Sequence, residues 1–362
     1  MEIKAKVSSL VHYNKNTMNM NIKNDLDRYA MRKVILQEAH QFADGFACVD
    51  EIQLSFPKKC TKVLVLGMGG SALGANIVDM YIQKMSRYGE FPYISVEPHR
   101  SYDLPLQSTK DTLHIVCSHS GNTEETLSVL KKVKEQDFPV VGVSSGGKLE
   151  QICQEQDIPF IKLPIPFENF QPRMASGHFF SVLMGIMIQG EMLPKTIKDD
   201  ILSQVGRLEE AIQEQESLGK EIASFLYKKT PLVYTTEQWK YLGMIWKIKI
   251  NENAKTPAFW NYFPELNHNE MVGFTQPQAD FAFLLLRDEN DDPRMLRRYE
   301  VFEEIMLKRG FSLKKVDIQS DSVYTSIFST LALGDWASYY LALSYGIDPT
   351  PVDMVETFKK ML

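Results

Sequence analysis

The chain has 362 residues, of which 44% are hydrophobic, and this is ample material for two domains of ordinary size. Its formal net charge is −6 at pH 7 and it has no block of lysine or arginine, so neither nucleic acid nor an acidic membrane surface is an expected partner. No stretch reaches the roughly 18 apolar residues of a membrane span, and residues 1–6 lead into no signal-peptide core, which predicts a cytoplasmic location.

A helical N-terminal region is predicted at residues 1–52. Positions 24–51 carry apolar residues at helical spacing, and Asn24 or Asp25 is the expected N-cap of one long helix.

Strands and helices then alternate through residues 53–194. The expected strands are 63–66, 93–96, 112–117, 140–143 and 160–163, and the expected helices are 71–85, 123–136, 147–156 and 173–190. Short, almost continuous apolar strands between amphipathic helices are typical of a parallel sheet that is covered on both faces. This segment is therefore predicted to form a doubly wound α/β domain.

Residues 195–362 repeat the alternation after a polar stretch, in which a helix at 203–225 is expected to bridge the halves. The expected strands are 232–235, 281–286 and 312–318, and the expected helices are 238–250, 293–309 and 325–345. A second doubly wound domain follows from this pattern. In Ser320-Asp-Ser-Val-Tyr-Thr325 the carboxylate of Asp321 would repel a phosphate, so we interpret this segment as a helix-capping turn.

Two strand-to-helix turns in the first half are rich in small residues. The first is Val63-Leu-Val-Leu-Gly-Met-Gly-Gly-Ser-Ala-Leu-Gly74, and the second is Ile115-Val-Cys-Ser-His-Ser-Gly-Asn-Thr-Glu-Glu-Thr126. Such turns direct backbone NH groups and hydroxyls toward one point, which suits a phosphate dianion at helix N-termini. The residues expected to hold a phosphorylated small molecule are Gly70, Ser71, Ser118, Ser120 and Thr123.

Neither turn fits a nucleotide site. The glycines of the first turn are spaced G-x-G-G-x-x-x-G, which is not the dinucleotide-binding spacing. The next strand ends in Glu97-Pro-His-Arg100, so the acidic residue that would bind the ribose lies close to a basic residue. The second turn has no lysine, unlike a P-loop. The simpler alternative is two ordinary tight connections, since glycine and serine are common wherever a strand turns into a helix.

The run Ser118-His-Ser-Gly-Asn-Thr-Glu-Glu-Thr126 resembles the phosphate-binding motif of the sugar isomerase (SIS) domain family, which usually has tyrosine in place of His119. Four later segments look like motifs of bifunctional phosphoglucose/phosphomannose isomerases: Glu168-Asn-Phe-Gln-Pro-Arg-Met-Ala175, Asn251-Glu-Asn-Ala-Lys255, Pro264-Glu-Leu-Asn-His-Asn-Glu270 and Asp348-Pro-Thr-Pro-Val352. The resemblance runs from about residue 63 to the C-terminus. It implies two SIS-type domains, which are flavodoxin-like or Rossmann-like.

The resemblance also implies an activity, the reversible conversion of glucose 6-phosphate or mannose 6-phosphate into fructose 6-phosphate through a cis-enediol. This reaction needs a base that moves a proton between C1 and C2, a cation for the enediolate and a group that opens the sugar ring. Glu252 matches the family base, and Arg173 stands at a helix start where its permanent charge would face the enediolate. Taken alone, Glu252 would be interpreted as a surface residue near a helix end.

Three further residues are assigned by the resemblance. His268 matches the ring-opening histidine, which in the family comes from the neighbouring subunit, so a homodimer is expected. Lys359 matches the lysine of the terminal helix that assists ring opening, and Lys360 beside it is the alternative. Thr350 loosely matches a threonine beside C2, where space admits mannose as well as glucose.

No organic cofactor or metal is expected, because the four cysteines are scattered without a CxxC pair or a ligand cluster and the related isomerases work by acid/base chemistry alone. Two alternatives remain. Another SIS-family phosphosugar isomerase would not need the set of Glu252, His268 and Lys359. A sugar-phosphate sensor would bind without turnover, although such sensors usually append a DNA-binding or partner domain.

Overall fold

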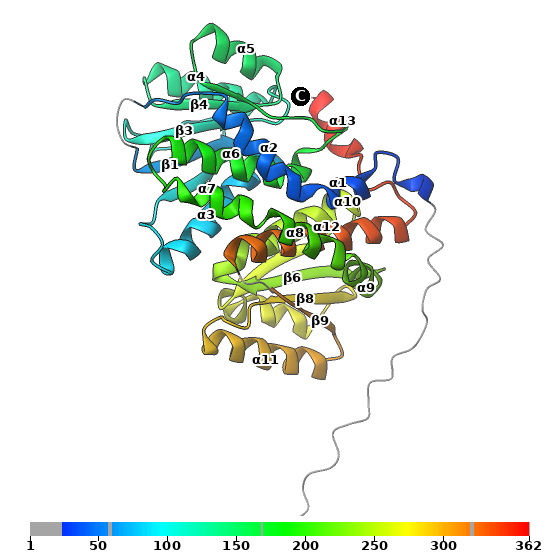
Figure 1. The fold of residues 1–362 in the computed structure, drawn as a ribbon. Helices are drawn as coiled ribbons and strands as arrows, with labels where there is room; N and C mark the ends of the chain where they lie inside the picture. The colour runs from blue at the N-terminus through cyan, green and yellow to red at the C-terminus, as the bar shows by residue number, and fades with distance from the viewer. Residues whose placement is uncertain (1–23, 57–59, 168, 319–321, 362) are drawn as a thin grey trace, which may run out of the picture.

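The computed structural model describes residues 24–56, 60–167, 169–318 and 322–361. Each half of the chain contributes one parallel sheet, and helices pack between the two sheets (Figure 1). The expectation of an α/β protein with two doubly wound sheets and an N-terminal helical region is confirmed.

The first sheet has five parallel strands in the order β2-β1-β3-β4-β5. The strands are β1 (Lys62–Gly67), β2 (Ser95–His99), β3 (Thr112–Cys117), β4 (Val140–Ser144) and β5 (Phe160–Lys162). This order reverses direction between β1 and β3, and open parallel sheets bind ligands at the carboxyl ends of the strands beside such a switch point. Every residue of β3 and β4 is buried, as their continuous apolar sequences predict.

Helices cover both faces of this sheet. They are α3 (Leu73–Arg87), α4 (Glu124–Glu135), α5 (Gly147–Glu155) and α6 (Ser176–Gln189). Leu64 and Leu66 of β1 pack with residues of α4 and α5, whereas Val63 and Val65 belong to the core that contains α3 and α6. Successive side chains of β1 thus point to opposite faces, as expected for a strand between two helical layers.

The second sheet has four parallel strands in the order β7-β6-β8-β9. The strands are β6 (Thr230–Thr236), β7 (Phe259–Phe263), β8 (Phe281–Arg287) and β9 (Ser312–Asp317), and the helices around them are α10 (Lys240–Asn253), α11 (Pro293–Lys308) and α12 (Val323–Ser344). Strand β7 was not predicted. Its signal is the aromatic run Phe-Trp-Asn-Tyr-Phe, which is bounded by Pro257 and Pro264.

The N-terminal region corrects one expectation, because residues 24–51 do not form a single helix. They divide into η1 (Asn24–Leu26), α1 (Met31–Leu36), η2 (Glu38–His40) and α2 (Gln41–Asp50). The chain turns at Ala30, which has a left-handed backbone with φ of 53°. Asp27 stabilises that turn, since its carboxylate accepts hydrogen bonds from the backbone NH groups of Met31 at 2.7 Å and Arg32 at 3.0 Å. The N-cap residue of α1 is Ala30, and the carboxylate of Asp27 accepts the capping hydrogen bonds in place of the predicted Asn24 or Asp25.

The predicted bridging helix at 203–225 is also divided. Three helices stand there, α7 (Thr196–Ser203), α8 (Val205–Glu214) and α9 (Glu216–Leu226). Both α8 and α9 pack on α12, where the indole of Trp336 donates to the carbonyl of Ile212 at 2.8 Å. The predicted capping turn before α12 is confirmed at Ser322, which accepts from the NH of Thr325, whereas Ser320 and Asp321 lie outside the described residues.

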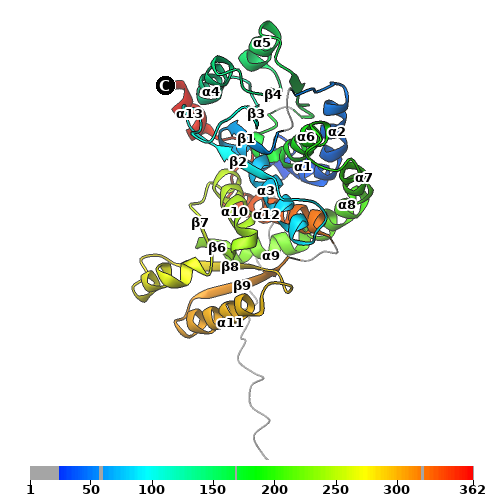
Figure 2. The ribbon, with the colours of Figure 1, turned by 90° about the vertical axis from the view of Figure 1, so that its left-hand side faces the viewer.

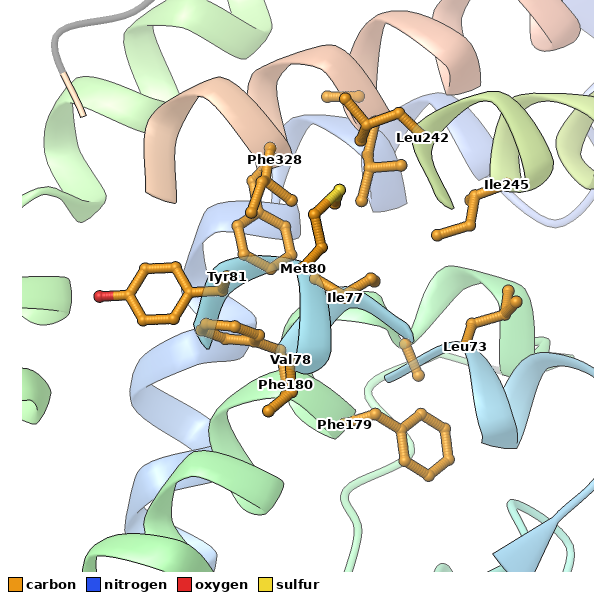
Figure 3. Packing of buried hydrophobic residues seen from close by; sticks show 14 of the residues in the cluster. Leu73, Ile77, Val78, Met80, Tyr81, Phe179, Phe180, Leu242, Ile245 and Phe328 are labelled. Atoms are coloured by element: carbon orange, nitrogen blue, oxygen red, sulfur yellow. The ribbon is translucent and has the colours of Figure 1, made fainter. Parts of the chain in front are cut away.

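The two halves repeat one order of elements. A helix precedes the first strand (α2 and α9), another follows it (α3 and α10), and a long buried helix packs against both (α6 and α12). Four of these helices meet in one core, where α3 and α6 contact α10 and α12 (Figure 3). The last helix, α13 (Asp353–Met361), has no buried residue and lies beside the first half (Figure 2). The domain limits at residues 52 and 195 stay predictions.

Candidate active site

The two small-residue turns meet at the switch point of the first sheet. Gly67 ends β1 so close to β3 that a Cβ there would come within 2.6 Å of the carbonyl oxygen of Cys117. Beyond the strands, the backbone NH of His119 donates to the hydroxyl of Ser71 at 2.9 Å. The first and second turns are therefore joined directly, as their predicted common role requires.

The second turn is a compact loop at the N-terminus of α4. The hydroxyls of Ser118 and Thr123 lie 2.9 Å apart, and the NH of Gly121 donates to Ser118 at 3.1 Å. Gly121 has φ of +69°, and a Cβ there would lie 1.7 Å from the carbonyl oxygen of Gly146, so only glycine fits. Ser118 is buried and Ser120 is exposed. This arrangement suits an anion at a helix N-terminus.

His119, where the family usually has tyrosine, adds no charge to this loop at neutral pH. Its ring packs beside Phe170, with centroids 6.0 Å apart, and burial lowers the pKa of the imidazole. The neighbouring His178 is fully buried, and burial lowers its pKa to about 4. The departure from the family motif therefore places a neutral ring behind the loop.

Arg173 reaches this site because Gly70 has no side chain. A Cβ at Gly70 would lie 2.8 Å from the backbone nitrogen of Arg173, in the short helix η4 (Pro172–Met174). The guanidinium is 2% exposed, and its Nη2 donates to the carbonyls of Pro349 at 3.1 Å and Thr350 at 2.8 Å. Burial lowers the pKa of Arg173, and the charge of Glu252 opposes that effect.

Glu252 lies at the end of α10 and faces the same guanidinium. Its Oε2 is 3.3 Å from Nη1 of Arg173, and its side chain is 34% exposed. The neighbouring Asn253 is fully buried, and its Oδ1 accepts from Nε of Arg173 at 2.6 Å. One carboxylate is thus held beside a fixed cation while it remains accessible from solvent.

Thr350 closes the other side of the guanidinium. Its residue is 2% exposed, and within the described ranges its hydroxyl oxygen has no hydrogen-bond partner. The segment around it is held by Lys255, whose ammonium donates to the carbonyls of Asp348 at 3.0 Å and Pro349 at 2.8 Å. Burial lowers the pKa of Lys255 to about 8, and the charge of Arg173 adds to that effect.

The structure brings together the two turns, Arg173, Glu252 and Thr350. It does not bring the remaining pair to them within one chain: among the described residues, no hydrogen bond or ion pair joins His268 or Lys359 to Arg173 or Glu252. His268 is exposed in η6 (Glu265–His268), which follows the edge strand β7. Lys359 pairs with Glu356 on the exposed face of α13.

Asn253 and Lys255 were missed as site residues, although both stand in the segment Asn251-Glu-Asn-Ala-Lys255 that carries Glu252. Helical spacing was the available signal for Asn253. It lies four residues after Lys249, so the two share a face of α10, but Glu252 lies three residues after Lys249 and is a neighbour of that face as well.

In the second sheet β6 and β8 hold the places of β1 and β3, and the residues at their carboxyl ends are different. Thr236 ends β6, Asp288 and Asp291 follow β8, and the hydroxyl of Thr236 donates to Asp291 at 3.0 Å. Lys84 from the first half lies 3.5 Å from Asp288. Carboxylates at this position would repel a phosphate.

In the ranges that the structure describes, no three His, Cys, Asp or Glu side chains are grouped as metal ligands. No helix of that part of the chain is long and apolar enough to cross a membrane.

Residues 58–167 match the SIS domain family, and residues 215–362 match the bacterial phospho-glucose isomerase C-terminal SIS domain. With the two parallel sheets and the joined turns, these matches define a SIS-domain sugar isomerase.

The bifunctional phosphoglucose/phosphomannose isomerase of Caldicellulosiruptor bescii is 33% identical over 83% of this chain and 89% of its own length. That of Aquifex aeolicus is 30% identical over 83% of this chain and 90% of its own length. The chain belongs to the family of bifunctional phosphoglucose/phosphomannose isomerases.

Among solved structures, a hypothetical protein of Thermus thermophilus superposes with a TM-score of 0.69 over 92% of this chain and 89% of that chain. Its sequence identity is 13%, so this likeness concerns the fold alone.

Proposed function

We propose that this protein interconverts glucose 6-phosphate and fructose 6-phosphate, and mannose 6-phosphate and fructose 6-phosphate, at one site through a cis-enediol. The observation that carries the proposal is the contact of Glu252 with Arg173 at 3.3 Å, beside a hydroxyl-lined turn at the N-terminus of α4. The sugar phosphate is the expected partner, and the expected location is the cytoplasm.

The phosphate is assigned to the second turn, with Ser118, Ser120 and Thr123, and Gly70 and Ser71 line the first turn. Backbone NH groups and the dipole of α4 favour a dianion there. This assignment places no ionised side chain of the loop itself against the phosphate, since burial lowers the pKa of His119.

Glu252 is assigned as the base that carries one proton between C1 and C2. Arg173 is assigned as the cation that stabilises the enediolate, since a buried, fixed guanidinium does not reorganise as charge develops. Of the hydrogens on Nη1 of Arg173, only one is needed for Glu252, so the other is available for a substrate oxygen. Thr350 is assigned to the space beside C2, where its hydroxyl has no partner in the described part of the chain.

Ring opening is assigned to His268 and Lys359. His268 is exposed on a segment at the edge of the second sheet, which supports its delivery to the site of a second copy. A homodimer that shares His268 across its interface is therefore part of the proposal. Lys359 lies on α13, which begins three residues after Thr350 and has no buried residue among those described.

The test is a coupled assay of fructose 6-phosphate formation from each aldose phosphate, with EDTA present and a Glu252→Gln variant as control. We expect activity on both substrates that survives EDTA and falls by about 10² to 10⁴-fold in the variant, as for loss of a positioned base. Binding of the sugar phosphates without turnover would instead indicate a sensor. Turnover of a different phosphosugar alone would indicate another SIS-family isomerase.

A further inference from the structure

A buried set of charged residues is connected to Arg173 through Asn253. Lys249 of α10 forms an ion pair with Asp335 of α12, and their side chains are 1% and 8% exposed. Removing two charges from water costs several kcal/mol for each ion unless their contacts compensate. The proposed catalytic steps use neither Lys249 nor Asp335, so those steps do not explain why this ion pair is buried.

This pair connects to the site through Asn253. The amide of Asn253 accepts from Nε of Arg173 at 2.6 Å through Oδ1, and its Nδ2 donates to the hydroxyl of Ser338 at 2.9 Å. Asp335 lies one helical turn before Ser338, and Asn253 favours its ionised form. The orientation of the amide is thus fixed by α12, and the amide in turn fixes the plane of the guanidinium.

The charges of these residues connect the ion pair to Arg173 in a second way. Arg173 and Lys249 are two buried cations, and Asp335 interacts favourably with both. Burial raises the pKa of Asp335, whereas Lys249, Arg173 and Asn253 favour its ionised form. Glu252 and Asp335 are the two carboxylates whose charges favour the charged form of Arg173, so without Asp335 only Glu252 would balance the guanidinium.

Glu38 of η2 brings the N-terminal region into the same set. It is 4% exposed, and it lines a void of about 10 Å³ together with Met31, Val34, Ile35, Met174 and Asp335. Met174 is the residue after Arg173. The charges of Asp335 and Lys249 change the pKa of Glu38. The charge of Glu38 in turn raises the pKa of Tyr324 of α12. Burial raises the pKa of Glu38 to about 8, and the charge of Asp335 adds to that effect, so the carboxyl is protonated at neutral pH.

We infer that Asp335, Lys249 and Glu38 are positioning residues, which hold Arg173 against Glu252 and keep its charge directed at the enediolate without touching the substrate. This inference rests on the proposed isomerase function. It also means that the N-terminal region affects catalysis through Glu38. An ionised Glu38 would add a negative charge near Arg173, and Arg173 would then stabilise the enediolate less.

The first test is the double variant Lys249→Met with Asp335→Asn, which removes both charges and keeps the side chains similar in size. The matched control is Lys84→Met with Asp288→Asn, another buried pair, whose side chains are 7% and 11% exposed and which lies at the second sheet. We expect kcat to fall about 10- to 100-fold in the test variant with KM changed less than about threefold, because a small misplacement of a catalytic group has this effect. The control variant should keep its kcat within about twofold. Thermal unfolding establishes that each variant is folded.

The second test is Glu38→Gln, which imitates the protonated carboxyl and does not ionise. Its kcat should equal that of the wild type at pH 7 and exceed it increasingly above pH 8, where Glu38 ionises. Lys255 also titrates near pH 8 but is present in both proteins, so the difference between their profiles isolates Glu38.

A folded Lys249→Met/Asp335→Asn protein with wild-type kcat would overturn the role of the ion pair. Superimposable profiles of Glu38→Gln and wild type from pH 6 to about 9.5 would overturn the role of Glu38. If the wild-type protein isomerises neither hexose phosphate, the proposed function fails and this inference fails with it, whereas an active wild type with unaffected variants contradicts the inference alone.

Discussion

Three nitrogen atoms of Arg173 bind partners from two separate segments, Glu252 with Asn253 and Pro349 with Thr350. A lysine keeps the charge but has no planar fork, so it cannot maintain these contacts together. We predict that Arg173→Lys lowers kcat by about 10² to 10³-fold, the range for loss of a donor that stabilises an oxyanion. Steady-state kinetics measure this, with Arg294→Lys on the exposed part of α11 as the control that keeps full activity.

At this scale the sequence predicts residue types better than their partners. Glu252, Arg173 and Thr350 could be chosen from motifs, and the structure places them in contact. Asn253 could not be ranked above its neighbours, because its role depends on Ser338 and Arg173, which lie 85 and 80 positions away. His268 and Lys359 keep the roles that the resemblance implies as predictions, since one chain does not bring them to the cleft.

Among the elements, the phosphate loop depends on one glycine. Gly121→Ala would combine a left-handed backbone with a Cβ 1.7 Å from the carbonyl oxygen of Gly146. We predict a loss of about 2–5 kcal/mol in the free energy of unfolding, from backbone strain and overpacking together, and a higher KM for every sugar phosphate.

The matched control is Gly89→Ala, where φ is +81° and, apart from the adjoining residues, no atom of the described ranges lies within 4 Å of the added Cβ. This variant has the backbone strain without the clash, so it should lose only about 1–2 kcal/mol and keep its KM. Urea unfolding and kinetics on both proteins measure the difference. Equal KM values for the two variants would contradict the role of the loop in phosphate binding.

The elements that were predicted well have a strong apolar signal, which is a continuous buried run in β3 and a helical periodicity in α4 and α11. The single helix expected at 24–51 was wrong because apolar spacing does not reveal a left-handed residue at Ala30 or a cap at Asp27. Strand β7 was missed because it is an edge strand, where only Phe263 is buried and the apolar pattern is weak.

On the scale of the whole molecule, the halves share one core. Buried residues of α3 and α6 pack with Leu242 and Ile245 of α10 and with Phe328 of α12 (Figure 3). We predict that the halves unfold together in one transition. The four tryptophans, Trp239, Trp246, Trp260 and Trp336, all lie in the second half, so their fluorescence reports that half, whereas far-UV circular dichroism reports both. Coincident urea transitions are expected, and two separated ones would contradict the shared core.

A second contact between the halves should depend on pH. Burial raises the pKa of Asp291 from 3.8 to about 6, near Lys84 and Asp288. Between these pH values the unfolded chain releases the proton and the folded protein keeps it, so this residue's contribution to stability is full below pH 3.8 and is lost as pH rises through 6.

We therefore predict that Asp291→Asn raises the free energy of unfolding relative to wild type at pH 7.5, and that the difference shrinks at pH 4.5. Urea unfolding at the two pH values measures it. A difference that is the same at both would show that Asp291 does not titrate in this range.

The exposed helix α13 has a practical consequence. Thr350 and Pro349 are bonded to Arg173 through their carbonyls, and the helix that follows spans only Asp353–Met361 without a buried residue. A fluorescent group attached to α13 would therefore lie within one short helix of Thr350 and would obstruct the substrate site. Biosensors and immobilised forms of this protein are better attached at a surface remote from that site, such as the solvent face of α11, where Arg294 and Arg297 are exposed.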